Sequence, residues 1–297
     1  MSPTFTPREH AGLKRVWRSL AYNVQTYVLR RRELTADLPW LQATLRAGSE
    51  DMLARRLYKT GHYEPGVTAF LLRYLSSAPQ DVVFDVGANV GYYSVLASKV
   101  CGPDVPVEAI EAEADNYGLL QRNIAANDAS SVTPHHCAVS DAPGELELYL
   151  WKKSNRGKHS LVPFEGARTV TVPSKTIAQI YAQRGHVGRT ISLLKIDIEG
   201  AEHQAFLGAG EVLKRCAVIV SEVSPKFLKR AGVDLDEHVN VIRRRGFAMF
   251  VVDGDARVTA CTPDQLRDAP KARNVVYVRK DLLKSTWARE LLGAAAS

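Results

Sequence analysis

Acidic residues stand at the predicted ends of five strands along the chain. They are Asp85, Glu111, Asp141, Asp197 and Glu222. In an open α/β sheet, ligands bind beyond the carboxyl ends of the strands. A carboxylate in that position can accept hydrogen bonds from ribose hydroxyls, or can take a proton from an attacking alcohol. One such residue would be explained as a helix cap, but five in succession indicate a crevice that binds a small molecule.

The stretch "VVFDVGANVGYYSV" (82–95) places an unusually bare backbone at the first of these strand ends. Its apolar start, over 82–84, suits a buried strand of a parallel sheet. Gly87, Ala88, Asn89 and Gly91 then form a turn before a helix, where glycines let a ligand approach the main chain. A turn without a ligand would need only one glycine, so we predict a small-molecule site here.

Glu111 follows Asp85 by 26 positions, at the end of the second predicted strand. A carboxylate there is the usual partner of the two ribose hydroxyls of a nucleoside. The preceding turn has the pattern G-x-N-x-G, whereas dinucleotide enzymes use G-x-G-x-x-G to approach a pyrophosphate. The pattern therefore favours S-adenosylmethionine over NAD as the cofactor.

Strands that alternate with helices must position these residues, and this order predicts an α/β fold with a doubly wound, mostly parallel sheet. The predicted strands are 82–85, 105–112, 132–140, 144–150, 191–198, 217–223, 248–253 and 274–280. The predicted helices are 67–75, 93–100, 115–127, 201–215 and 235–247. The polar, basic stretch 151–168 is predicted to be a mobile loop.

The basic charge of the chain is concentrated near its start. Of the net charge of +7, residues 1–60 contribute +6, from eleven Lys/Arg and five Asp/Glu. Residues 14–32 place apolar side chains along one helical face between basic ends. We expect this face to cover the core, as is common, and the alternative is a helix on an anionic surface such as a membrane.

Length and composition suit a soluble globular protein, with 45% hydrophobic and 24% charged residues in 297. The four cysteines contain no C-x-x-C pair, so we expect reduced thiols. No apolar run is long enough to cross a membrane, and no signal-peptide core is present, so the expected location is cytoplasmic. The expected organisation is a basic helical extension (1–60), a catalytic domain (61–285) and a C-terminal tail (286–297). The last residues of this tail, "LLGAAAS" (291–297), are predicted to be frayed.

Four segments resemble the FkbM family of S-adenosylmethionine-dependent methyltransferases. They are "DVGANVGYYS" (85–94), "IEAEADNYGLLQRNI" (110–124), "AVSDAPGELEL" (138–148) and "LLKIDIEGAEHQAFLGA" (193–209). With "TGHYEP" (60–65), the resemblance spans about residues 60–253. It implies the class I methyltransferase (Rossmann-like) fold, with a seven-stranded sheet whose last strand is antiparallel. Its members are mostly O-methyltransferases that act on sugar or natural-product hydroxyls.

The resemblance also implies a cofactor site. The turn with Asp85 would frame the methionine half of the cofactor, Glu111 would hold the ribose, and Ser140 with Asp141 would border the adenine. Ala112 replaces the proline that the family usually has after the ribose glutamate. The residues assigned to the cofactor are Glu64, which could close over it, Asp85, Gly87, Ala88, Asn89, Gly91, Glu111, Ala112, Ser140, Asp141 and Asp197.

Asp197, Glu199 and Glu222 are predicted to face the transferred methyl, where a carboxylate can accept the proton of the acceptor hydroxyl. Lys195 is the fourth predicted catalytic residue. In the alternative interpretation, Lys195 and Glu199 pair with each other and only hold the strand end. Two of the carboxylates could hold a divalent ion, but their spacing does not predict a metal.

The predicted acceptor is a hydroxyl of a sugar, glycan or natural product. An RNA methyltransferase is the nearest alternative because of the basic N-terminus. Enzymes that methylate exocyclic amines of nucleic acids need an N-P-P-aromatic run where this chain reads "DIEG", so no nucleic-acid partner is expected. A second alternative is a non-catalytic cofactor-binding or membrane-surface protein of the same fold.

Overall fold

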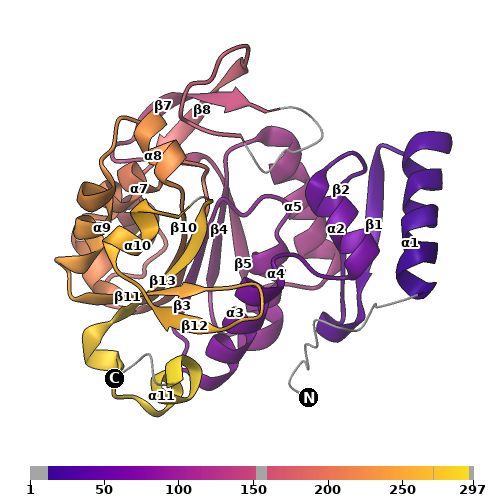
Figure 1. Cartoon of the computed structure of the whole chain (residues 1–297). Coiled ribbons are helices and arrows are strands. Elements are labelled where there is room, and N and C mark those ends of the chain that lie inside the picture. The colour runs from indigo at the N-terminus through magenta and orange to yellow at the C-terminus, as the bar shows by residue number, and fades with distance from the viewer. Residues whose placement is uncertain (1–12, 152–158, 270, 294–297) are drawn as a thin grey trace.

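The structure is a computed structural model that describes residues 13–151, 159–269 and 271–293. Its central sheet contains β3 (Val82–Val86), β4 (Val107–Glu111), β5 (Val132–His136), β9 (Ile191–Ile196), β10 (Cys216–Val223), β11 (Phe247–Val252), β12 (Val258–Ala260) and β13 (Arg273–Arg279). They lie in the order β12-β11-β13-β10-β9-β3-β4-β5 (Figure 1). Within this sheet, β10, β9, β3, β4 and β5 are parallel to one another. Strand β13 is antiparallel to both of its neighbours, β10 and β11. This is the class I methyltransferase arrangement, with β12 as an additional short strand at the edge.

The strands at the centre of this sheet are buried along their whole length. Every residue of β3 and β9 is buried, because helices cover both faces. One face carries α3 (Pro65–Ser77), α4 (Tyr92–Cys101), α5 (Ala114–Ala126) and α11 (Thr286–Leu292). The other carries α6 (Ile177–Gln183), α7 (Glu202–Ala209), α8 (Pro225–Arg230) and α9 (Leu235–Arg243). The short elements η4 (Gly210–Arg215), α10 (Pro263–Arg267) and η5 (Lys280–Leu282) complete this part of the chain.

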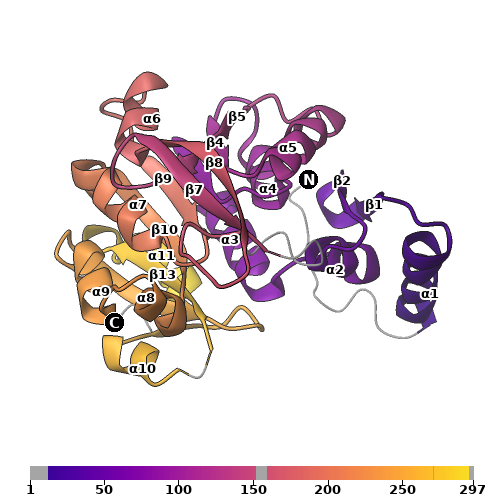
Figure 2. The same cartoon turned by 90° about the horizontal axis from the view of Figure 1, so that it is seen from above.

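A second, three-stranded sheet lies beyond the carboxyl ends of the central strands, and Figure 2 shows it from above. It has the order β6-β8-β7, from β6 (Ala138–Val139), β7 (Gly144–Leu150) and β8 (Arg168–Lys175). Strand β8 was not predicted, although its alternating "TVTV" pairs with β7 in antiparallel register. Of the predicted loop 151–168, residues 152–158 lie outside the described ranges.

The N-terminal extension is only partly helical. It consists of α1 (Leu13–Asn23), a π-helical turn η1 (Val24–Val28), β1 (Glu33–Leu38), the 3₁₀ turn η2 (Pro39–Leu41), β2 (Ala43–Gly48) and α2 (Met52–Thr60). Strands β1 and β2 form an antiparallel hairpin that the sequence analysis did not predict. Asn123 of α5 and Asn127, which follows that helix, fix this hairpin, because their side-chain oxygens accept the main-chain N–H groups of Arg46 and Thr44, respectively.

The apolar face of α1 does not cover the core, so that prediction is wrong. Tyr22 and Thr26 are buried against the rest of the extension, whereas Val16, Trp17 and Leu20 point to the exterior. The apolar residues and the anchoring residues lie on opposite faces of the helix.

The prediction of a frayed end is wrong at Leu291 and Leu292, which are buried at the end of α11. Earlier in the same helix, Trp287 is buried, and its ring centre lies 5.0 Å from that of Tyr74 in α3. Residues 294–297 of the predicted tail lie outside the described ranges. Among the helices that are described, none is both long enough and apolar enough to cross a membrane.

Candidate active site

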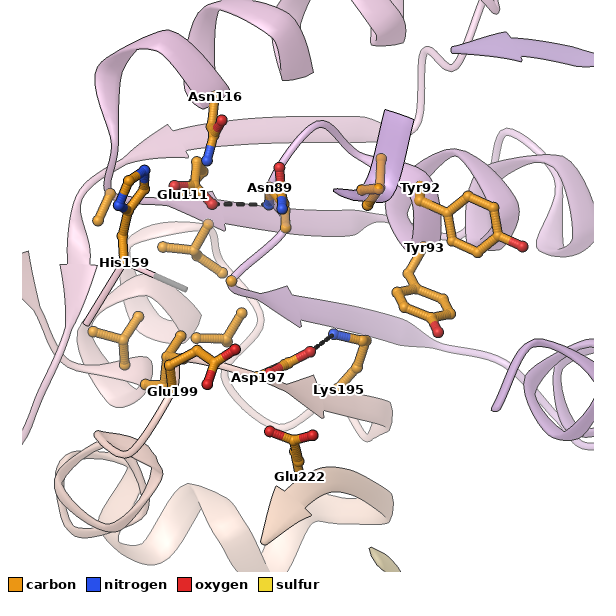
Figure 3. A pocket seen from close by; sticks show the side chains of 18 of the residues that line it. Asn89, Tyr92, Tyr93, Glu111, Asn116, His159, Lys195, Asp197, Glu199 and Glu222 are labelled. Carbon is orange, nitrogen blue, oxygen red and sulfur yellow. Dashed lines mark hydrogen bonds and ion pairs between the residues drawn. The ribbon is translucent and has the colours of Figure 1, made fainter. Parts of the chain in front are cut away.

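A cavity of about 500 Å³ lies at the carboxyl ends of β3, β4, β9 and β10 (Figure 3). Most residues predicted for the site line it. These are Glu64, Gly87, Ala88, Asn89, Glu111, Ala112, Lys195, Asp197, Glu199 and Glu222. The cavity lining does not include Asp85, Gly91, Ser140 or Asp141, and these four are located below.

The turn after β3 brings two strand ends into close contact. Gly87 has a φ of 79°, and a Cβ at this position would lie 2.0 Å from the carbonyl oxygen of Asp197. Asn89 has a φ of 53°, in the same left-handed region. Gly91 also has a positive φ, but it begins α4, and a Cβ there would lie 2.6 Å from the Leu120 side chain. Gly87 therefore shapes the cavity, whereas Gly91 serves the packing of α4 on α5.

Glu111 is held by the main chain on both oxygens. Its Oε2 accepts the N–H of Asn89 at 2.8 Å, and its Oε1 accepts the N–H of Glu113 at 2.9 Å. Burial raises the pKa of Glu111 to about 7, although these two N–H groups act in the opposite direction. Each carboxylate oxygen has a second lone pair, so the fixed group can still accept hydrogen bonds from a diol in the cavity.

Lys195 joins the ends of β3 and β9 through its charge. Its Nζ lies 3.5 Å from Oδ2 of Asp197 and 4.0 Å from Oδ1 of Asp85. Burial opposes the charged form, but the Coulombic attraction of Asp197, Asp85 and Glu64 raises the pKa of Lys195 above its ordinary value. Lys195 thus pairs with Asp197 and Asp85, whereas the alternative interpretation had paired it with Glu199.

Asp85 lies behind the cavity wall, because β3 and β9 pair in a register that places it opposite Lys195. It is buried, and its Oδ2 accepts a hydrogen bond from Ser94 Oγ at 2.6 Å. Asp85 therefore holds the lysine and the start of α4 from behind, and it does not reach the cavity surface itself.

Three carboxylates gather on the wall near Lys195 (Figure 3). Oxygen atoms of Asp197, Glu199 and Glu222 all lie within 4.8 Å of one another. They come from the ends of β9 and β10, as the sequence predicted. Such a cluster can accept protons or attract a cationic centre.

A fourth carboxylate, Glu64, approaches this cluster from the segment before α3. It accepts a hydrogen bond from the Tyr93 hydroxyl at 2.8 Å. Burial, with the nearby negative charge of Asp197, raises the pKa of Glu64 above its ordinary value. Both Glu64 and Tyr93 line the cavity.

Glu202 holds the loop that carries two of the clustered carboxylates, and the sequence analysis did not single it out. Its two oxygens accept the N–H groups of Ile198 and Gly200, each at 2.9 Å. Burial raises the pKa of Glu202 to about 7. Glu199, between the two donors, adopts a left-handed φ of 51°, so the fold of this loop depends on Glu202. The only sequence signal was its place in "DIEGAE".

The predicted adenine residues are not brought to the cavity. Ser140 Oγ bonds to the neighbouring Asp141 at 2.9 Å, and the main chain of Ser140 packs against Gly208 of α7. The residues just before them, Cys137, Ala138 and Val139, line the cavity instead. With Val86, Ile110 and Leu148 they form an apolar part of its wall.

The sequence analysis also missed aromatic and amide residues of the cavity. Tyr92, Tyr93 and Asn116 line it, although each lies on a helix where the pattern indicated only packing. His159, in the predicted loop, lines the cavity as well, and its Nδ1 accepts the N–H of Trp151 at 2.8 Å.

Comparison with known proteins identifies the family of the chain. The model of the methyltransferase FkbM domain matches residues 85–249, which is more than half of the 297 residues. A solved structure, the methyltransferase FkbM from Methylobacillus flagellatus KT, has 16% identity and a TM-score of 0.42, and the match covers 89% of this chain and 58% of that one.

Two curated relatives are similar over shorter segments. The methyltransferase sdnD of Sordaria araneosa is 29% identical over 158 residues, covering 43% of this chain and 60% of that protein. The hexuronic acid methyltransferase AglP of Haloferax volcanii is 26% identical over 155 residues, covering 52% and 58%. The chain thus spans about 60% of the length of these relatives.

A third relative matches over more of its length. The 31-O-demethyl-FK506 methyltransferase FkbM of Streptomyces tacrolimicus is 26% identical over 239 residues, covering 70% of this chain and 85% of that protein. The family model and the order of the site residues along the chain agree, and the protein belongs to the FkbM methyltransferase family.

Proposed function

We propose that this protein is an S-adenosylmethionine-dependent O-methyltransferase that methylates a hydroxyl of a sugar, glycan or natural product. One observation carries the proposal. Glu111, fixed by two main-chain N–H groups, and the carboxylate cluster of Asp197, Glu199 and Glu222 face the same cavity (Figure 3).

The residues of the cavity fit the cofactor. Glu111 would accept the two ribose hydroxyls, and the apolar wall around Ile110 and Val139 would enclose the adenine. The main chain at Gly87 would lie against the methionine half. Oδ1 of Asn89 is buried and has no hydrogen-bond partner among the described residues, so it can receive a donor from the ligand.

S-adenosylmethionine would supply an electrophilic methyl on its sulfonium. In the proposed mechanism, the carboxylates of Asp197, Glu199 and Glu222 orient the acceptor hydroxyl, and one of them takes its proton as the oxygen attacks. Lys195 holds Asp197 in place from within the wall. Tyr92 and Tyr93 of α4 line the cavity together with Glu64.

The names of two relatives support a hydroxylated acceptor. One is described as a hexuronic acid methyltransferase and the other as a 31-O-demethyl-FK506 methyltransferase. The first name gives a sugar acid as the acceptor, and the second name specifies an oxygen atom. Both names agree with the O-methylation proposed for this chain.

Calorimetric titration of the purified protein with S-adenosylhomocysteine, with NAD as the control, tests the cofactor. Saturable binding of S-adenosylhomocysteine alone is expected. Mass spectrometry of uronic acids, neutral glycosides and hydroxylated macrolides incubated with S-adenosylmethionine then tests for a mass gain of one methyl. A folded protein that does not bind S-adenosylhomocysteine would overturn the proposal. Binding without methylation of any hydroxyl would favour a non-catalytic protein.

A further inference from the structure

The helical segment α1–η1 carries an apolar surface that faces away from the protein. Of the twelve large hydrophobic side chains exposed in the described ranges, six lie in this short segment and a seventh, Leu29, directly follows it. The exposed fractions reach 64% for Trp17 and 71% for Val28. The seven residues are Val16, Trp17, Leu20, Val24, Tyr27, Val28 and Leu29. Six of them, all except Leu29, recur at helical spacing and form what we call the outer face.

The opposite side of this segment is anchored, so the outer face cannot simply turn inward. The Tyr22 hydroxyl donates to the carbonyl oxygen of Ser49 at 2.6 Å, and Lys59 Nζ lies 4.9 Å from the centre of its ring. The side chain of Gln25 bonds to the hydroxyl of Tyr58 in α2. The exposure of the outer face therefore follows from specific contacts on the other side.

The charged residues of segment 13–32 are all basic. They are six Lys/Arg with no Asp/Glu, and the acidic residue that follows, Glu33, is paired with Arg122 of α5. Arg30, Arg31 and Arg32 are exposed directly after η1, and Arg18 is half-buried within α1. An apolar face containing Trp and Tyr, between basic ends, has the composition of a helix that lies in the interface of an anionic bilayer.

The position of α1 leaves this face accessible. Both views show α1 as the outermost element on its side of the molecule, with α2 between it and the central domain (Figures 1 and 2). On the inner side, Met52, Leu53 and Arg56 of α2 line the cavity. If a flat surface bound the outer face of α1, only α2 would therefore lie between α1 and the cavity.

We propose that the outer face, with the arginines at 30–32, binds the surface of anionic lipid membranes. A bilayer accepts the apolar side chains and the cationic ends at the same time. A second copy of the same face would bring six positive charges against six others, with no acidic residue in the segment to pair them. Charge complementarity therefore favours the membrane over self-association.

Co-sedimentation of the full chain with vesicles tests this surface. Vesicles of 30% phosphatidylglycerol in phosphatidylcholine should bind the protein, and pure phosphatidylcholine vesicles should bind it weakly. The triple variant Trp17→Ser, Leu20→Ser, Val28→Ser should lower the partition coefficient by about 100-fold, because it removes most of the insertable area. Replacing Arg30, Arg31 and Arg32 by Gln should lower it by roughly 100-fold.

A matched control uses exposed apolar residues elsewhere. Val170→Ser, Val187→Ser and Leu207→Ser alter three exposed side chains outside the N-terminal extension, and should leave partitioning unchanged. Circular dichroism checks that each variant is folded. A vesicle-induced blue shift of fluorescence should disappear in Trp17→Phe, which retains binding, and a shift that persists would overturn insertion of this face.

Light scattering, which measures the oligomeric state, distinguishes membrane binding by the outer face from self-association with a second copy of the chain. Absence of vesicle binding, or equal loss of binding in the control variant, would overturn the proposal. A dimer that the outer-face variant dissociates, without vesicle binding by the wild type, would assign the face to self-association. Neither measurement requires cofactor or acceptor, so the result is independent of the proposed methyl transfer.

Discussion

The main-chain N–H of Asn89 donates a hydrogen bond of 2.8 Å to Oε2 of Glu111. This bond ties the turn after β3 to the end of β4, so the two parts of the predicted cofactor site are built as one unit. Asn89 has a left-handed φ in this turn, and the main-chain N–H of Glu113 fixes the other carboxylate oxygen. The carboxylate is thereby positioned before any ligand arrives.

Replacing Glu111 by Ala should weaken binding of S-adenosylhomocysteine by about 10- to 100-fold. The expected loss is roughly 1.5–3 kcal/mol, the range for hydrogen bonds to a charged group. Calorimetry measures the affinity, and Glu145→Ala, at an exposed position of β7, is the control. If Glu111→Ala binds as tightly as the control, Glu111 does not hold the ligand.

Glu222→Gln should lower turnover by about 100-fold or more while binding of S-adenosylhomocysteine is retained. Asp197→Asn should also lower turnover, because it loses both a carboxylate and the attraction to Lys195. The rate at saturating S-adenosylmethionine measures this effect. Normal turnover in both variants would exclude these two residues from the proton transfer.

Gly87→Ala should destabilise the protein much more than Gly185→Ala does. Both glycines have a positive φ, of 79° and 71°, so both variants carry a backbone cost of about 1–2 kcal/mol. Only at position 87 would the new Cβ meet the Asp197 carbonyl at 2.0 Å, since nothing lies within 4 Å at Gly185. Urea unfolding measures both, and equal losses would contradict the role of this close contact.

Lys195→Met should cost about 3–5 kcal/mol of unfolding free energy, because it leaves the buried Asp85 without its cation. The double variant Lys195→Met, Asp85→Asn should recover part of this loss. A double-mutant cycle from urea unfolding gives the coupling. Additive losses would show that the two residues do not stabilise each other.

The raised pKa of Glu202 predicts a pH dependence of stability. In the unfolded chain this carboxyl titrates near its ordinary value of 4.5, whereas burial raises its pKa to about 7 in the folded protein. The folded state therefore binds more protons between these values, and the contribution of Glu202 is present below pH 4.5 and is lost as the pH rises through 7. Glu202→Gln should reduce the decline in stability between pH 5 and pH 7.5.

Urea unfolding at the two pH values measures this slope. Glu145→Gln, which changes an exposed carboxylate, should leave it unaltered. An unchanged slope in Glu202→Gln would show that this group does not titrate between the two states.

The central strands could be predicted from the sequence because their burial is encoded locally. The apolar runs of β3, β9 and β10 are long and bounded by polar residues, and the acidic residues that end them marked the edge of the sheet where ligands bind. The turn at 87–91 and Glu111 could be assigned for the same reason, since each lies next to its strand in the sequence.

Pairings between distant strands could not be predicted in this way. The register of β3 against β9 places Asp85 opposite Lys195, and no local pattern distinguishes this partner from Glu199. Likewise, only the packing of α7 against Ser140 shows that this residue is turned away from the cavity.

The N-terminal segment shows most clearly the difference between what the sequence determines locally and what only the tertiary structure decides. Its sequence determined an amphipathic basic helix, because the spacing of Val16, Leu20 and Val24 is a local property. The same spacing serves a helix that covers a core and a helix that faces outward. Only the tertiary structure decided between them, because the anchoring of Tyr22 to Ser49 fixes which face is buried.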